Sequence, residues 1–126
     1  MGYGAAGYPD TGIPFIIDGG GSVITAGEKG HVACPYNGDI EAVELLADQS
    51  GSIVVDIWKG IYDNFPPTDA GSITGSSPPT ISSAQKSRDT TLTGWTKPTK
   101  KGEILAFNVD SCTTITRVTV MLFIKR

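Results

Sequence analysis

The amino-acid sequence predicts an all-β fold, and three observations lead to this. Thirteen Ile and eight Val against five Leu give a β-branched bias, which suits a pleated sheet better than a helix. Gly, Pro, Ser and Thr together make up 48 of the 126 residues, as expected for strands joined by loops. Several segments alternate apolar and polar residues with the two-residue period of a half-buried strand.

The first part of the chain predicts short elements separated by turns. Residues 1–12 show no apolar periodicity and are expected to form an extended arm before a single domain over residues 13–126. Short strands are expected at residues 12–17 and 31–35, on either side of a loop containing the flexible tract Asp18-Gly-Gly-Gly-Ser22. Asn37-Gly38 is the strongest hairpin signal in the chain, because a type I′ turn needs positive φ at both central positions.

The next segment, residues 40–47, contains good helix formers but is framed by turn signals. Because Asn37-Gly38 precedes it and Asp48-Gln-Ser-Gly51 follows it, we interpret it as a strand between two hairpins, with a helix as the alternative. Three clearer strands follow, at residues 52–59, 102–109 and 114–125. Their expected core-facing side chains are Ile53, Val55, Ile57, Leu105, Phe107, Val109, Val118, Val120, Leu122 and Ile124.

Residues 60–101 lose all periodicity and contain two Pro-Pro pairs. Forty structureless residues are unusual inside a small domain. Isolated apolar residues in this polar stretch are therefore expected to anchor short edge strands or turns, the alternative being a mobile loop. These residues are Ile73, Ile81, Leu92 and Trp95.

Charge and composition exclude several classes of function. The formal net charge is −3, which argues against nucleic-acid binding by the whole chain. Residues 1–63 carry −7 and residues 64–126 carry +4, so one molecule could offer an acidic patch to the basic patch of another. We find no membrane span and no secretion signal. Cys34 and Cys112 are expected to be free, half-buried thiols in a protein made in a reducing compartment.

Catalytic patterns are weak, so we predict no enzymatic activity, no metal and no cofactor. The single histidine, His31, lies three residues from Cys34, which places the two side chains on opposite faces of a strand. The glycine tract after Asp18 lacks the Lys-Ser/Thr pair of a phosphate-binding loop. Asp48, Asp56 and Asp63 are interpreted as solvated carboxylates, and Lys97, Lys100 and Lys101, near Trp95, as a solubilising loop.

Apolar side chains on expected outer faces suggest a covered surface instead. Met121 and Phe123 lie on the outer face of the last strand, and three aromatic residues, Trp58, Tyr62 and Phe65, end or follow the strand at 52–59. They either cap an open end of a sandwich or lie between copies of the protein. We favour the oligomer interface, because a monomer of this size rarely exposes so much apolar surface.

In order along the chain, these motifs resemble a family of small β-rich modules in structural proteins of tailed bacteriophages, over residues 13–126. The matching stretches are Phe15-Ile-Ile-Asp-Gly-Gly-Gly21, Leu45-Leu-Ala-Asp-Gln-Ser-Gly-Ser-Ile-Val-Val-Asp-Ile-Trp-Lys59, Pro66-Pro-Thr-Asp-Ala70, Ser72-Ile-Thr74, Pro78-Pro-Thr-Ile-Ser82, Asp89-Thr-Thr-Leu-Thr-Gly-Trp95, Phe107-Asn-Val-Asp-Ser111 and Thr113-Thr-Ile-Thr-Arg-Val118.

The resemblance implies a virion component with a jelly-roll-like, antiparallel β-sandwich, a homotrimer without enzymatic activity. In such a trimer, the Pro-Pro segments could be ordered along neighbouring subunits. The expected interface residues are Trp58, Tyr62, Phe65, Met121 and Phe123.

Because only about 12 residues precede the module, we expect a head decoration or cement protein rather than a tail fibre. It would be made in the host cytoplasm and would bind the major capsid protein on the outer surface of the capsid through arm residues Tyr3, Tyr8, Pro9 and Asp10. Nucleic acid, membrane and a small-molecule substrate are not expected partners. The alternative is a receptor- or carbohydrate-binding tip of a tail appendage, with Trp95 or Tyr62 stacked on a sugar.

Overall fold

The computed structural model describes residues 8–126 and confirms the all-β prediction for them. Every strand pair is antiparallel, and two short 3-10 turns, η1 (Tyr62–Asn64) and η2 (Asp69–Gly71), are the only helical segments in the described part. The strands are β1 (Thr11–Asp18), β2 (Gly27–Ala33), β3 (Gly38–Gly60), β4 (Thr80–Asp89), β5 (Pro98–Thr99), β6 (Ile104–Thr113) and β7 (Arg117–Lys125).

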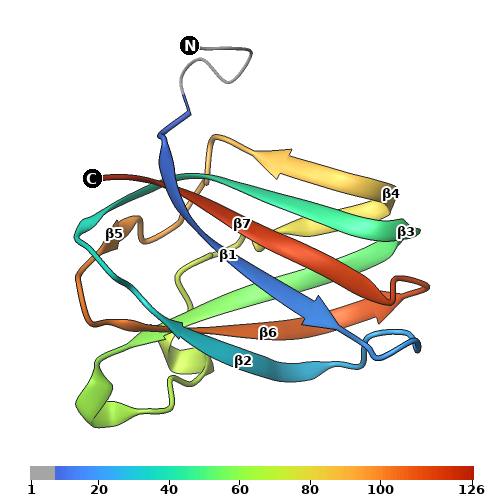
Figure 1. Cartoon of the computed structure of the whole chain (residues 1–126), viewed down its shortest axis with the longest axis horizontal. Helices are drawn as coiled ribbons and strands as arrows, with labels where there is room; N and C mark the ends of the chain where they lie inside the picture. The colour runs from blue at the N-terminus through green and yellow to red at the C-terminus, as the bar shows by residue number, and fades with distance from the viewer. Residues whose placement is uncertain (1–7) are drawn as a thin grey trace.

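The strands form one curled sheet in the order β1-β7-β3-β6-β2, with β4 and β5 paired to β3 off this path (Figure 1). The first half of β3 pairs with β7 and the second half with β6, so the long strand leads the sheet from one side of the core to the other. Phe15 of β1 stacks on Phe107 of β6 with ring centroids 4.3 Å apart, which shows that the two parts meet across a common core. The described residues therefore form one antiparallel, curled sheet. The β-sandwich and the jelly roll that the resemblance implies remain predictions.

The predicted inner faces of the clearest strands are confirmed. All ten core-facing side chains named for the three clearer strands are fully buried. Alternation was sufficient here because each of these strands has one face on the core. The four isolated apolar residues of the polar stretch, Ile73, Ile81, Leu92 and Trp95, are buried as well.

The predicted turn at residues 48–51 is wrong, because these residues lie inside β3, a single strand of 23 residues. The register shifts between Leu46 and Gly51, so the strand bends without reversing. Asp48 accepts hydrogen bonds from the backbone N–H groups of Thr116 and Arg117 at 3.1 and 3.0 Å. Asp48 thus stabilises the connection between β6 and β7 instead of forming part of a hairpin turn.

The hairpin expected at Asn37-Gly38 is also wrong. The strand expected at residues 31–35 overlaps β2 only at residues 31–33, and β2 pairs with β6 and not with β3. Neither Asn37 nor Gly38 has the positive φ of a type I′ turn. The Asn37 side chain instead accepts a hydrogen bond from the backbone N–H of Lys101 at 2.8 Å, which ties this connection to the β5–β6 loop.

Residues 61–101 pack against the sheet of their own chain. The backbone N–H of Ile73 donates to Ile57 O at 2.9 Å, and Pro67 and Pro79 are buried. The segment also contains β4, a ten-residue strand that the sequence hides because most of its side chains are polar and exposed. The chain after β3 therefore lies along an edge of β3 and contributes its apolar side chains to the common core.

Candidate interaction surfaces

The five predicted interface residues lie in two separate groups. Met121 and Phe123 project from the outer face of β7, where both are half-buried. Trp58, at the end of β3, Tyr62 in η1 and Phe65 just after it belong to the other part of the molecule. The loop that carries Tyr62 and Phe65 is the lowest part of the molecule in Figure 1, whereas β4 lies at the top. No single flat surface contains the predicted set.

One predicted arm residue, Tyr8, contacts one predicted interface residue, Phe123, within the same chain. The Tyr8 ring packs on Phe123 with centroids 4.9 Å apart, and the Arg88 guanidinium lies 5.2 Å from the centroid of the Tyr8 ring. Tyr8 and Pro9 are half-buried and Asp10 is exposed, while Tyr3 lies outside the described residues. The end of the predicted arm is therefore anchored on the outer face of the sheet, over β7 and β4.

The outer face beside this anchor carries two exposed aliphatic side chains. The register aligns Ile16 of β1 with Thr119 of β7, Leu46 of β3 and Lys86 of β4. Ile16 is 61% exposed and Leu46 is 49% exposed. Since neighbouring strands are about 4.8 Å apart, the two side chains are roughly 10 Å from each other on one face. Ile16 and Leu46 thus form a small exposed apolar area on the outer face of the sheet.

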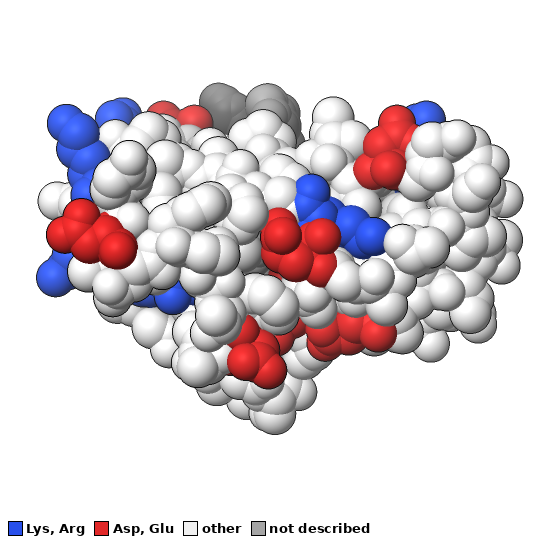
Figure 2. Space-filling view, turned by 90° about the horizontal axis from the view of Figure 1, so that it is seen from below, with Lys and Arg blue, Asp and Glu red and all other residues white. Residues whose placement is uncertain are grey.

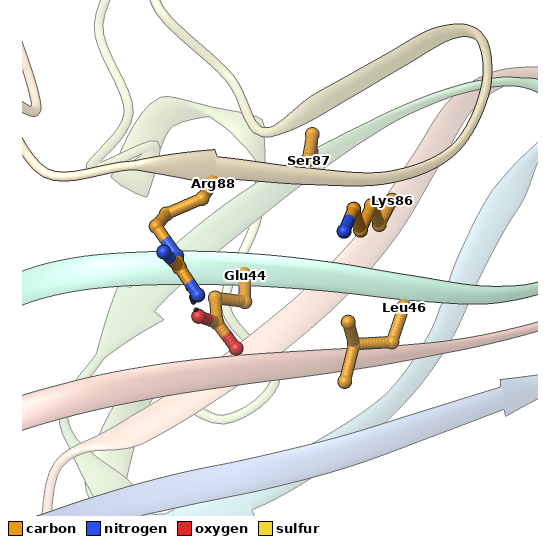
Figure 3. A pocket seen from close by; sticks show the side chains of 5 residues that line it. All are labelled: Glu44, Leu46, Lys86, Ser87 and Arg88. Carbon is orange, nitrogen blue, oxygen red and sulfur yellow. Dashed lines mark hydrogen bonds and ion pairs between the residues drawn. The ribbon is translucent and has the colours of Figure 1, made fainter. Parts of the chain in front are cut away.

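A hollow of about 250 Å³ lies next to Leu46 and is lined by Glu44, Leu46, Lys86, Ser87 and Arg88. Figure 3 shows Glu44 and Arg88 meeting at one end, Leu46 and Lys86 beside them, and Ser87 pointing away. The Arg88 Nε donates to Glu44 Oε2 at 2.8 Å. The site is a depression open to solvent, with one apolar side chain, Leu46, one internal ion pair and one additional cation.

Trp58 is half-buried and takes part in a polar network centred on Asp56. Asp56 Oδ2 accepts a hydrogen bond from Trp58 Nε1 at 3.0 Å, and Oδ1 accepts from Ser72 Oγ at 2.8 Å and from Thr74 Oγ1 at 2.7 Å. Thr74 is 1% exposed. Asp56 is therefore no solvated carboxylate, which corrects the sequence-based expectation. The network fastens the segment after η2 to β3.

The exposed tip below this network consists of Ile61, Tyr62 and Phe65, which are 54%, 76% and 51% exposed. Phe65 packs on the ring of His31, with centroids 4.6 Å apart. Tyr62 lies beside a hollow of about 410 Å³ whose lining includes Asp63, Lys100 and Lys101. The tip combines an accessible aromatic ring with charges of both signs.

The carboxylate, thiol and imidazole groups that could take part in catalysis lie apart from one another. Hydrogen bonding by the Thr116 side chain is the main cause that lowers the pKa of Asp48 to about 2. Burial raises the pKa of the Cys34 thiol to about 11 and also raises the pKa of Cys112; both cysteines are free. His31 Nε2 lies 3.4 Å from Glu28 Oε2. Within residues 8–126, no three His, Cys, Asp or Glu side chains are grouped to hold a metal ion.

Charge on the surface follows no single sign. Figure 2 shows acidic and basic side chains interspersed on the face seen from below. Trp95, expected near the basic loop, is only 8% exposed, and its Nε1 donates to Ser77 O at 2.8 Å. It is therefore not an exposed aromatic platform. No helix in residues 8–126 has the length and apolar character needed to cross a membrane.

Sequence reasoning missed four exposed apolar residues, Ile16, Leu46, Val23 and Ile61. The signal for the first two was available, because alternation places Ile16 opposite Ile17 and Leu46 opposite Leu45 on their strands. It was obscured because both are next to core residues in apolar runs. Compared with protein-family models, curated proteins and solved structures, the chain matched none.

Proposed function

We propose that this chain is a structural protein of a tailed-bacteriophage virion, a homotrimeric decoration protein that binds the major capsid protein on the outside of the assembled head. The resemblance over residues 13–126 points to this class. The observation that carries the proposal is the exposure of large apolar side chains on both outer sides of a small β domain, which is typical of subunits covered by copies or partners. No catalytic step is part of the proposal.

The physical mechanism is linkage to the assembled lattice. Contacts that form only on the mature shell shift the equilibrium towards that shell, and many copies add their modest effects. The arm contributes Tyr3, Tyr8, Pro9 and Asp10 to the capsid contact. Because Tyr8 packs on Phe123, the point where the arm leaves the domain is fixed against the sheet.

The test is particle binding by a truncated chain. Deleting residues 1–7 is sharper than deleting 1–12, because the longer deletion also removes Tyr8 and the first residues of β1. We expect the truncated protein to keep its oligomeric mass and to lose binding to heads that lack the native protein. Full occupancy of the heads by the truncated protein would show that residues 1–7, Tyr3 included, do not make the contact.

A second candidate is a carbohydrate-binding tip of a tail appendage. Tyr62, 76% exposed beside a hollow that contains Asp63, Lys100 and Lys101, is the observation that favours it. Copy number separates the two functions, since hundreds of copies per particle indicate the shell and a few tens the tail. A glycan array with the Tyr62→Ala variant as control tests sugar binding directly.

A further inference from the structure

We propose that copies of this chain assemble head-to-tail, with Tyr62 of one copy inserted into the hollow beside Leu46 of the next. The inference deepens the proposed function, since it names the two surfaces by which copies meet. Only the expected number of subunits, three, is taken from the proposed function. The contact itself is argued from the size, charge and placement of the two surfaces.

The sizes of the two surfaces match. Tyr62 is the most exposed large apolar side chain of the described residues and lies in η1, on the loop after β3 that forms the lowest part of the molecule in Figure 1. An apolar cavity of about 150 Å³ holds a benzene ring. The hollow beside Leu46 is open to solvent and is lined mainly by polar residues, and its volume of about 250 Å³ is sufficient for one phenol ring. Filling it would also cover Leu46, which is 49% exposed in the single chain.

The same pairing offers one ion pair between copies. Among the described residues, neither Lys86 in the hollow nor Asp63 next to Tyr62 makes an ion pair. Inserting Tyr62 beside Leu46 brings Asp63 close to Lys86 of the next copy. Lys100 and Lys101 border the same turn and weaken the acidic character of the tip. The Asp63–Lys86 pair therefore adjusts the affinity, while burial of the apolar groups supplies most of it.

The placement of the two surfaces decides the symmetry. A two-fold interface matches one patch with the same patch on the partner, whereas a cyclic trimer needs two different, complementary patches on each chain. The Leu46 hollow lies over β3 and β4, and Tyr62 lies on the loop after β3, so the chain has two such patches. A head-to-tail contact closes into a ring if its rotation permits and otherwise continues as a filament.

A mixing experiment tests the contact. Leu46→Arg adds a third cation to the hollow, and Tyr62→Ser removes the inserted ring. Each variant alone is expected to be monomeric by analytical ultracentrifugation. An equimolar mixture is expected to contain a species of twice the monomer mass, because Tyr62 of the Leu46→Arg chain still fits the intact hollow of the Tyr62→Ser chain.

The matched control is Val23→Arg, an exposed apolar residue outside both surfaces, 44% exposed, which should leave the wild-type mass unchanged. Denaturation midpoints of all three variants establish that they fold. The contact is overturned if both single variants keep the wild-type mass or if the mixture stays monomeric while the wild type is a trimer; the proposed virion function survives either result. A monomeric wild type at high concentration overturns both proposals.

A charge exchange gives an independent readout. Lys86→Glu and Asp63→Lys should each weaken self-association by a factor of about five or more, as expected for the loss of a surface ion pair of about 1 kcal/mol and the added repulsion. The chain carrying both substitutions should recover most of the wild-type affinity. Additive weakening in the double variant would show that these residues do not face each other.

Discussion

Replacing Asp56 by Ala should destabilise the fold clearly, because its carboxylate joins two segments of the chain. The carboxylate accepts side-chain hydrogen bonds from Trp58, Ser72 and Thr74, each at 3.0 Å or less. Hydrogen bonds to a charged group contribute roughly 1.5–3 kcal/mol each, and bonds that share one acceptor group are not additive. Because the carboxylate is only partly buried, water replaces some of them in the variant. We expect a loss of about 3 kcal/mol, a large part of the roughly 5–15 kcal/mol that stabilises a typical domain.

Urea denaturation followed by tryptophan fluorescence measures this loss. The midpoint should fall at constant slope, because the surface exposed on unfolding is nearly unchanged. Trp58 loses its hydrogen-bond partner, so native-state emission should move to longer wavelength, and residues 61–79 should become sensitive to protease.

The matched control is Asp39→Ala, an exposed carboxylate of the same strand whose side chain accepts no hydrogen bond from the described residues; its effect should stay within about 0.5 kcal/mol. A loss below about 1 kcal/mol for Asp56→Ala, with the segment still protease-resistant, would refute the role assigned to the network.

Three other outcomes follow from the structure. Phe107→Ala removes a fully buried ring that stacks on Phe15 and should cost about 3–5 kcal/mol in chemical denaturation; a cost below 1 kcal/mol would contradict the packing. The folded-state pKa of Asp48, about 2, lies below its ordinary value of 3.8, so its stabilising effect is present above that value and is lost as pH falls through the folded pKa. Asp48→Asn should therefore flatten the acid limb of the stability curve between about pH 4 and 2, and an unchanged limb would contradict the hydrogen bonding from Thr116. The Cys34 thiol, whose pKa is raised to about 11, should react with a thiol reagent at pH 8 only after unfolding, and fast labelling of Cys34 in the native protein would contradict its burial.

The sequence by itself determined the β class, the inner faces of the clearest strands and the apolar anchors of the polar stretch. These features are local, because alternation depends only on neighbouring side chains and on which of them avoid water. The same reasoning found Tyr62 and Phe65 as accessible aromatic residues, since both follow a strand in a segment without a core-facing pattern.

Only the tertiary structure decided how the strands connect and which polar side chains are hydrogen-bonded to distant segments. Residues 48–51 have the composition of a turn, yet Asp48 supports the β6–β7 connection, 68 residues away along the chain. Asp56 has the place of a solvated residue on the outer face of its strand, yet a segment 16 to 18 residues later covers it and supplies its donors. These hydrogen-bond donors are positioned by packing between segments that are far apart in the sequence, so a local sequence pattern does not predict them.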